Sequence, residues 1–406
     1  MPNIQSFQCS RCGEHVVPAR DEYATVCPQC AGSLYVRYAR EDMRRARRDE
    51  VKDGAQSMWR YGVVLPSVEP VTLGEGWTPM LRSRMHQNLW WKEEGANPTG
   101  SFKARGLGMA VTMAKHFGVR KIAIPSAGNA AGALAAYCAA AGIEAHIFMP
   151  KDVPKANYVE CVAYGAQVTL VDGLIGDCGK VVAGRKQEEG WFDISSLKEP
   201  FRVEGKKTMG YELAEQFGWE LPDVVFYPTG GGVGLVGMWK AFEEMEEMGW
   251  IRKGTPRPRM VVVQAAGCAP IPKAFEEGKL TSEMWPNATT AASGLRVPKS
   301  YGDYIVLDIV RKSGGTAIAI TEEEMFESLG EWAQHEGVVL SPEGAMATAA
   351  YDKLMAGGWL KPSERVLIFN TGSGMKYTDV IAQGLRIRRA PQRAESAKVG
   401  GIIGPF

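Results

Sequence analysis

The chain of 406 residues lacks the features of a membrane, secreted or nucleic-acid-binding protein. No apolar run is long enough to cross a bilayer, and the segment from Met1 to Gln5 has no signal-peptide pattern. The formal net charge is only +1, which excludes binding to nucleic acid or a membrane surface through bulk electrostatic attraction. The sequence has no internal repeat. These absences predict a cytoplasmic globular protein whose partner is a small molecule, and the length predicts two or three domains.

Four of the eight cysteines predict a structural zinc site near the start of the chain. Cys9 and Cys12 form one Cys-x-x-Cys pair, and Cys27 and Cys30 form a second pair, with fourteen residues between the two pairs. This spacing suits tetrahedral coordination of one zinc ion by four thiolates, which leaves no open position for catalysis. The alternative is four unrelated free thiols, and free thiols are also what we expect of the scattered remaining cysteines.

Short apolar runs alternate with helical stretches from about Val71 onward. The runs are continuous rather than alternating with polar residues, which is typical of parallel strands covered by helices on both faces. The predicted strands are Leu89–Lys92, Ile122–Pro125, Ala145–Met149, Gln167–Val171, Val224–Tyr227, Met260–Val263 and Val366–Phe369. An Ala-rich helix is expected over Ala130–Ala141, ending at Gly142, and a solvated helix or linker over Arg40–Lys52. The pattern predicts an α/β fold.

Three loops follow predicted strands, at the edge where open parallel sheets bind ligands. The loop from Ser126 to Asn129 has small residues that can approach an anion and an amide that can hydrogen-bond. The glycine loop, Gly230 to Gly234, suits a phosphate. No Lys-Ser or Lys-Thr pair follows its last glycine, as a nucleoside-triphosphate loop requires, and it lacks the glycine spacing of a dinucleotide site. Thr371 offers a hydroxyl after the last strand. Each loop alone is as often a simple tight turn.

Lys103 is the candidate centre of a site. A proline and a glycine interrupt the chain before it, and a helix-compatible run from Gly108 to His116 follows. A helix start disfavours a protonated amine, and a neutral lysine attacks aldehydes. An ordinary surface lysine is the alternative. Beside a phosphate-binding loop of neither nucleotide type, the lysine indicates pyridoxal phosphate, which has both an aldehyde and a phosphate.

The segment from Asn97 to Gly106 resembles the Pro-Thr-Gly-Ser-Phe-Lys-Asp-Arg-Gly motif of the fold-type II pyridoxal-phosphate enzymes, and within them the chain is most similar to the threonine synthases. Glu75 to Pro79 and Ser126 to Asn129 resemble two further family motifs, and the resemblance extends to about Asp379. It implies that Lys103 forms the Schiff base with the cofactor. The other cofactor-binding residues that it implies are Asn129, Gly230, Gly231, Gly232, Val233, Gly234 and Thr371.

The segment from Ser195 to Gly205 resembles the family segment whose serine and arginine hold a substrate phosphate. An arginine fork suits a phosphate dianion, and a serine hydroxyl adds a donor. The alternative is that Arg202 pairs with Glu199 or Glu204. The expected substrate-binding residues are Ser126, Ala127, Ser196 and Arg202.

The resemblance implies a lyase that converts O-phospho-L-homoserine and water to L-threonine and phosphate. Two departures leave the substrate open. Ala104 stands where the family has an acidic residue, and the glycine loop replaces a Gly-Asn-x-Gly-Asn loop and is closer to that of the serine and threonine dehydratases. The alternatives are a threonine or serine ammonia-lyase, an O-phosphoserine-using enzyme similar to the cysteate synthases, and a zinc-ribbon binding protein with an inactive catalytic domain.

The resemblance also implies the architecture, which is two doubly wound sheet domains of the tryptophan synthase β-like type, an N-terminal zinc ribbon and assembly as a homodimer. We expect the ribbon over residues 1–38 and a large cofactor-binding domain over residues 39–92 and 191–390. A smaller α/β domain is expected over residues 93–190, and a flexible tail over residues 391–406.

Overall fold

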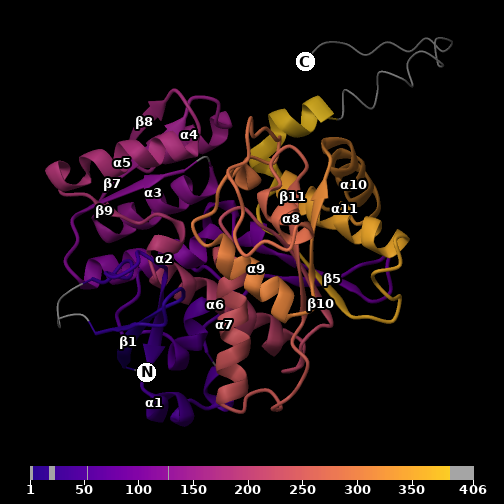
Figure 1. Cartoon of the computed structure of the whole chain (residues 1–406), viewed down its shortest axis with the longest axis horizontal. Helices are drawn as coiled ribbons and strands as arrows, with labels where there is room; N and C mark the ends of the chain where they lie inside the picture. Colours follow the sequence, from indigo (N-terminus) through magenta and orange to yellow (C-terminus); the bar gives the residue numbers. More distant parts are fainter. Residues whose placement is uncertain (1–2, 18–22, 53, 127, 385–406) are drawn as a thin grey trace.

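Two α/β sheets and one small cysteine-rich sheet make up the molecule (Figure 1). The computed structural model describes residues 3–17, 23–52, 54–126 and 128–384. All seven predicted strands are present, with bounds that differ from the predicted ones by no more than two residues. The α/β fold is therefore confirmed. The predicted tail over residues 391–406 lies outside the described residues.

The larger sheet has six strands in the order β12-β11-β10-β13-β5-β4, and all neighbouring pairs are parallel except β4 with β5. Its strands are β4 (Met80–Arg82), β5 (Leu89–Glu93), β10 (Val224–Pro228), β11 (Arg259–Ala265), β12 (Thr316–Ile320) and β13 (Val366–Asn370). The sequence did not predict the two edge strands. β4 has only three residues, and the short run of Ala and Ile in β12 fits a helix as well as a strand.

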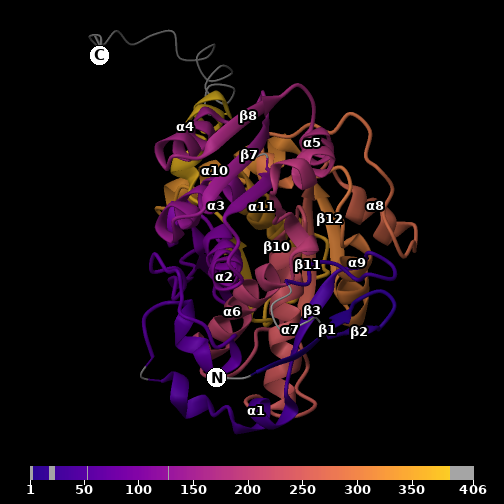
Figure 2. The same ribbon diagram turned by 90° about the vertical axis from the view of Figure 1, so that its left-hand side faces the viewer.

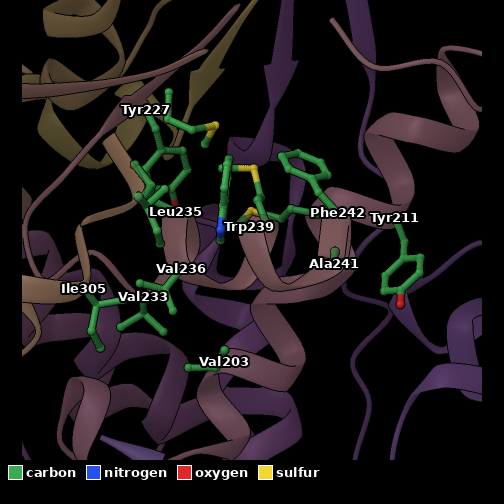
Figure 3. Packing of buried hydrophobic residues seen from close by; sticks show 14 of the residues in the cluster. Val203, Tyr211, Tyr227, Val233, Leu235, Val236, Trp239, Ala241, Phe242 and Ile305 are labelled. Carbon is green, nitrogen blue, oxygen red and sulfur yellow. The ribbon is translucent and has the colours of Figure 1, made fainter. Parts of the chain in front are cut away.

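Alternate residues of the larger sheet point into two hydrophobic cores. Val225 and Tyr227 pack on one face with α6, α7 and α9, whereas Val224 and Phe226 pack on the other face with α10 and α11. Figure 3 shows part of the first core, where Leu235, Trp239 and Phe242 of α7 lie among buried side chains. The helices of this part are α6 (Phe201–Gln216), α7 (Val233–Glu247), α8 (Pro270–Glu276), α9 (Asp303–Lys312), α10 (Glu322–His335) and α11 (Pro342–Ala356).

The smaller sheet has four parallel strands in the order β8-β7-β6-β9. Its strands are β6 (Lys121–Pro125), β7 (Glu144–Pro150), β8 (Gln167–Val171) and β9 (Phe192–Asp193). Ile122 and Ile124 pack with α2 and α3 on one face, and Ala123 packs with α5 on the other. The helices are α2 (Lys103–His116), α3 (Asn129–Ala141), α4 (Lys155–Ala163) and α5 (Ile175–Glu189). As predicted, α3 ends at Gly142, whose φ of 70° is left-handed.

The N-terminal segment forms a cysteine ribbon, which we define as the antiparallel strands β1 (Ile4–Cys9), β2 (His15–Val16) and β3 (Leu34–Tyr38) with the two Cys-x-x-Cys pairs. It lies beside α7 and α9 (Figure 2). Its Phe7 ring packs edge-on against Phe201 of α6, with 5.8 Å between the ring centroids. The ribbon therefore shares the core of the larger sheet.

The charged stretch over Arg40–Lys52 forms α1 (Arg40–Arg45), which has no buried residue, and a short turn, η1. The short 3₁₀ turns are η1 (Arg48–Val51), η2 (Met58–Val64), η3 (Glu94–Ala96), η4 (Pro98–Gly100), η5 (Ser196–Lys198), η6 (Ser293–Leu295) and η7 (Gly374–Tyr377). Within the described ranges, no helix has the length and apolarity needed to span a membrane. The domain boundaries stay a prediction, and β9 joins the smaller sheet just beyond the predicted limit at residue 190.

Candidate active site

One cavity of about 260 Å³ lies at the carboxyl ends of β6, β10 and β13. It brings together the predicted site residues from segments that are far apart in the sequence. Those that line it are Lys103, Ser126, Asn129, Ser196, Arg202, Gly230, Gly231, Gly232, Val233, Gly234 and Thr371. Ala127 lies outside the described residues. The rule that open parallel sheets bind ligands at the carboxyl ends of their strands therefore identifies the correct edge of both sheets.

Lys103 is the first residue of α2, as predicted, and the loop before it is held against the last strand. Thr99 and Gly100, with φ of 60° and 63°, turn the chain. Ser101 then pairs with Gly372, and the N–H of Phe102 donates to the carbonyl of Thr371 at 3.1 Å. These contacts fix the start of the helix beside the Thr371 loop.

The amine of Lys103 has no hydrogen-bond or ion-pair partner among the described residues and faces the cavity. Burial, assisted by the positive charge of Arg202 and opposed by Glu343, lowers the pKa of Lys103 to about 7. The sequence therefore predicted the direction of this shift, but burial is its main cause, and not the start of the helix. At neutral pH a large fraction of this amine is uncharged and nucleophilic.

The glycine loop leaves no room for side chains. A Cβ atom on Gly230 would lie 2.4 Å from the carbonyl oxygen of Gly294, and a Cβ on Gly234 would lie 1.8 Å from the hydroxyl of Tyr227. Gly232 has a φ of 81° and immediately precedes α7. The first N–H groups of a helix have no partner within it, so the backbone of this loop and of α7 can receive an anion.

Asn129 and Thr371 supply polar groups from the other two loops. The Nδ2 of Asn129 donates to the hydroxyl of Tyr377 at 3.0 Å, and its Oδ1 is buried with no hydrogen-bond partner among the residues that the structure describes. Thr371 is 5% exposed and lies directly after β13. Ser126 lines the cavity, and its hydroxyl also accepts the N–H of Ala131 at 3.1 Å and so supports the first turn of α3.

Arg202 and Ser196 form what we call the anion wall of the cavity. Arg202 is 4% exposed, its Nη1 donates to the carbonyl of Ile194 at 2.9 Å, and its Nε has no partner. Burial lowers its pKa to about 10, so it remains charged at neutral pH. Ser196 has a φ of 21°, an uncommon conformation for a residue other than glycine.

The alternative that Arg202 pairs with a neighbouring carboxylate is wrong. Glu199 accepts the backbone N–H groups of Phe201 and Arg202, at 2.9 and 2.7 Å, and forms no ion pair with the guanidinium among the described residues, although its charge and that of Asp193 partly oppose the lowering of the pKa of Arg202. Glu204 pairs instead with Lys207 at 2.8 Å and with Lys240. A buried guanidinium without an acidic partner can bind an anion in the cavity.

Lys206 and Glu343 also line the cavity, although the sequence did not point to them. Lys206 follows Arg202 by one helical turn, and this spacing is the only signal that could have found it. Glu343 is the single acidic residue at the start of the apolar helix α11. One of its oxygens accepts the N–H of Gly294 at 2.8 Å and the hydroxyl of Tyr377 at 3.0 Å, and the other is buried without a partner.

Ala104, which we expected to bear on the substrate, is fully buried in the core of the smaller sheet and does not line the cavity. The next residue, Arg105, is also fully buried and pairs with Glu94 and Glu212, each at 2.7 Å. These ion pairs tie the start of α2 to α6 and to the segment after β5. The departure at Ala104 therefore changes packing and not the cavity surface.

The four cysteine sulfurs of the ribbon lie within 4.8 Å of one another. Cys9 and Cys30 are 3.5 Å apart and Cys12 and Cys27 are 3.7 Å apart, close to the edge of about 3.8 Å expected for a tetrahedron with zinc–sulfur bonds of about 2.3 Å. A Cβ on Gly32 would lie 2.8 Å from the Cys9 sulfur. The cluster can hold a tetrahedral metal ion.

The residues of the cavity fit pyridoxal phosphate. The glycine loop and the start of α7 form a cradle that side chains would fill, which suits the phosphate. Lys103 has a free amine for the aldehyde, and Asn129 and Thr371, which line the same cavity, add an amide oxygen and a hydroxyl. The arrangement can hold a cofactor and, on the anion wall, a negatively charged substrate group.

Comparison with known proteins agrees with this arrangement. Residues 71–372 match the family described as pyridoxal-phosphate dependent enzyme. The chain is 33% identical to the threonine synthase of Methanocaldococcus jannaschii over 92% of this chain and 93% of that protein. It is 32% identical to the threonine synthase of Methanosarcina acetivorans over 91% and 92%.

Solved structures share the fold at lower identity. Maize serine racemase superposes with a TM-score of 0.63 at 21% identity, covering 77% of this chain and 93% of that one. The L-serine ammonia-lyase of Rhizomucor miehei superposes with a TM-score of 0.66 at 18% identity, covering 78% and 99%. At these identities the similarity concerns the fold alone.

Proposed function

Because this chain belongs to the family of pyridoxal-phosphate dependent enzymes and is a lyase, we propose that it converts O-phospho-L-homoserine and water to L-threonine and phosphate. The main support for this substrate is Arg202. Its side chain is 4% exposed and lines the cavity, and its guanidinium has no carboxylate partner among the described residues. A buried cation without an acidic partner is costly unless a ligand neutralises it. The identity of more than 30% to two threonine synthases supports the same substrate.

Lys103 has two roles in this proposal. Bound pyridoxal phosphate supplies an aldehyde that bonds to the lysine amine and a ring that accepts an electron pair from the substrate. Lys103 would hold the cofactor between reactions. Once the substrate amine has taken its place, the neutral Nζ of Lys103 would take the proton from the substrate Cα. The pKa of about 7 suits both roles, because the amine can accept and return a proton at neutral pH.

The other cavity residues would bind and orient the cofactor and the substrate. The glycine loop and the first N–H groups of α7 would hold the cofactor phosphate, Asn129 would bind the ring hydroxyl, and Thr371 would bind the ring nitrogen. Ser196 and Arg202 would hold the substrate phosphate until loss of a proton from Cβ expels it from Cγ. Cγ would then gain a proton, water would add its hydroxyl at Cβ, and a proton would return to Cα. Thr371 is neutral and would stabilise a protonated ring nitrogen less than a carboxylate would.

The glycine loop favours a second candidate, because its sequence is closer to that of the serine and threonine dehydratases. Deamination of threonine or serine needs no anion wall, whereas replacement at Cβ of O-phosphoserine would use it. Purified protein should be incubated with O-phospho-L-homoserine, O-phosphoserine, threonine and serine, with phosphate, ammonia and amino acids assayed. Threonine and phosphate from the first compound alone support the proposal, and ammonia from threonine or serine without phosphate release from the first would overturn it.

We also propose that the cysteine cluster holds one structural zinc ion. The four sulfurs have tetrahedral spacing, and the N–H groups of Arg11 and Cys12 point to the Cys9 sulfur at 3.4 and 3.5 Å, which stabilises a thiolate there. Four thiolates leave no open position, so the ion would stabilise the ribbon and take no part in the reaction. Elemental analysis of the purified protein tests this, with one zinc ion per chain expected.

A further inference from the structure

Two tyrosines connect the cysteine ribbon to the cavity. The hydroxyl of Tyr301 donates to the carbonyl of Ala31, the residue after Cys30. The hydroxyl of Tyr304 lies 2.7 Å from that of Ser10, which stands between Cys9 and Cys12. Each Cys-x-x-Cys pair therefore contacts one tyrosine, in the region where the ribbon lies beside α9 (Figure 2).

The segment that carries these tyrosines forms part of the cavity. Tyr301 lines it, and the adjacent Ser300 donates to the carbonyl of Gly231 in the glycine loop at 3.1 Å. A Cβ on Gly302 would lie 2.2 Å from Leu197, so this segment is in direct contact with the turn that holds Ser196. The ammonium of Lys198, at the end of the same turn, lies 5.5 Å from the Tyr301 ring centroid.

A second set of contacts runs from the ribbon segment to Arg202. The hydroxyl of Tyr23 donates to Glu199 at 2.8 Å, and Glu199 in turn accepts the backbone N–H of Arg202. The ring of Phe7 in β1 packs on Phe201. Both residues of the anion wall therefore stand on elements that the N-terminal segment supports.

We propose that the metal-loaded ribbon positions the anion wall, so that the metal controls binding of the substrate phosphate and not of the cofactor. The metal cross-links the two Cys-x-x-Cys pairs, and this fixes Ser10 and Ala31, which hold Tyr304 and Tyr301. Tyr301 and Tyr304 are positioning residues, since they act through the turn that holds Ser196. This inference rests on the proposed function for its substrate, but its test does not need turnover.

The test measures the Kd of inorganic phosphate for the cofactor-loaded protein by titration calorimetry, in the wild type and in a Tyr301→Phe, Tyr304→Phe double variant. Each change removes one hydroxyl and leaves the ring. We expect the Kd to rise about 3- to 10-fold, because each lost hydrogen bond has a modest net free energy. The metal content and the absorbance of the bound cofactor should stay unchanged. Tyr158→Phe in α4, at an exposed tyrosine away from the cavity, is the matched control and should leave the Kd unchanged.

Protein depleted of its metal by a chelator provides a second measurement, and its Kd should rise at least as much as that of the double variant. An unchanged Kd in the double variant or in the depleted protein would overturn the inference, and so would loss of the cofactor absorbance in the double variant. If the wild type binds phosphate but releases none from O-phospho-L-homoserine, the proposed substrate fails and this inference stands. A wild type that binds no phosphate overturns the inference itself.

Discussion

The amines of Lys103 and Lys206 lie on the same aromatic ring, each 3.9 Å from the centroid of Phe102. Burial lowers the pKa of both lysines, and the charge of Lys103 lowers that of Lys206 further. Two amines on one ring in a buried site cannot both be protonated without a large cost in free energy. Lys206 donates to the carbonyl of Phe102, whereas Lys103 has no such acceptor among the described residues. The charge of Lys103 therefore helps to keep Lys206 neutral, and the Phe102 carbonyl holds the Lys206 amine while the Lys103 amine stays without an acceptor.

This difference predicts which lysine bonds to the cofactor. Lys103→Ala should abolish the long-wavelength absorbance of bound pyridoxal phosphate and lower kcat by about 10³-fold, the usual range for loss of a general base. Lys206→Met is the matched variant in the same cavity and should keep the absorbance. Absorbance spectra of the two purified variants show which lysine bonds to the cofactor. If the absorbance survives in Lys103→Ala, another amine holds the cofactor.

The pKa of Lys103 predicts how cofactor capture depends on pH. Only the neutral amine attacks an aldehyde, so the rate at which the apoprotein binds pyridoxal phosphate should rise with pH and level off above about 7. With an exposed lysine, the rate would keep rising up to about pH 10.4. Stopped-flow absorbance measures the rate.

Two variants should move this midpoint in opposite directions. Arg202→Gln removes a positive charge that lowers the pKa of Lys103, so the midpoint should move to higher pH. Glu343→Gln removes a negative charge that raises this pKa, so the midpoint should move to lower pH. Equal midpoints in all three proteins would contradict the electrostatic account.

The glycine loop predicts a steric effect on cofactor affinity. A Cβ on Gly230 would lie 2.4 Å from a backbone oxygen, which cannot move away as a flexible side chain can. We expect Gly230→Ala to raise the Kd of pyridoxal phosphate by about 10-fold or more, since overpacking typically costs about 1–3 kcal/mol. Gly184→Ala in α5 is the control, because a Cβ there meets nothing within 4 Å and alanine favours a helix. Titration of the apoproteins gives both constants.

Much of this site could be predicted from the sequence, because its loops directly follow strands that are buried on both faces. Continuous apolar runs such as Val224–Tyr227 locate the strand ends, and the strand ends locate the cavity. Lys206 and Glu343 could not be predicted, because their place in the cavity depends on how α6 and α11 pack. Nearly all of α6 is buried, so its sequence has no amphipathic stripe that would separate cavity residues from core residues.

The hydroxyl of Ser126 illustrates a different limit. The sequence correctly places it at the end of a strand, but it cannot tell whether the hydroxyl meets a ligand or the first turn of the next helix. Similarly, Ala104 departs from the family motif, and only its burial in the core of the smaller sheet separates a packing change from a change in the cavity.

The cysteine cluster predicts a stability effect that depends on metal. Cys27→Ser should lower the zinc content and the Tm together, because binding of a structural metal contributes directly to the free energy of folding. Cys268→Ser is the control, since Cys268 is equally buried but far from the cluster in the sequence and outside the four-sulfur set. Elemental analysis and calorimetry measure the two quantities. A Cys27→Ser protein with full zinc content would show that the ion is bound elsewhere.

Arg202 predicts how the enzyme recognises its substrate. Its guanidinium is buried and forms no ion pair with a carboxylate in the described part of the chain, so the phosphate of the proposed substrate would be its counterion. Arg202→Gln should raise KM for O-phospho-L-homoserine about 10- to 100-fold, as expected when a hydrogen bond to a charged group is lost, and should lower kcat much less. The KM of Arg202→Lys should lie between those of the wild type and Arg202→Gln, because an ammonium keeps the charge but loses the planar fork.

The control is Arg185→Gln in α5, at a side chain that is 52% exposed, which should change neither KM nor kcat. Steady-state release of phosphate measures all four proteins. If KM stays constant in Arg202→Gln, the anion wall does not bind the substrate, and an unphosphorylated amino acid becomes the better candidate.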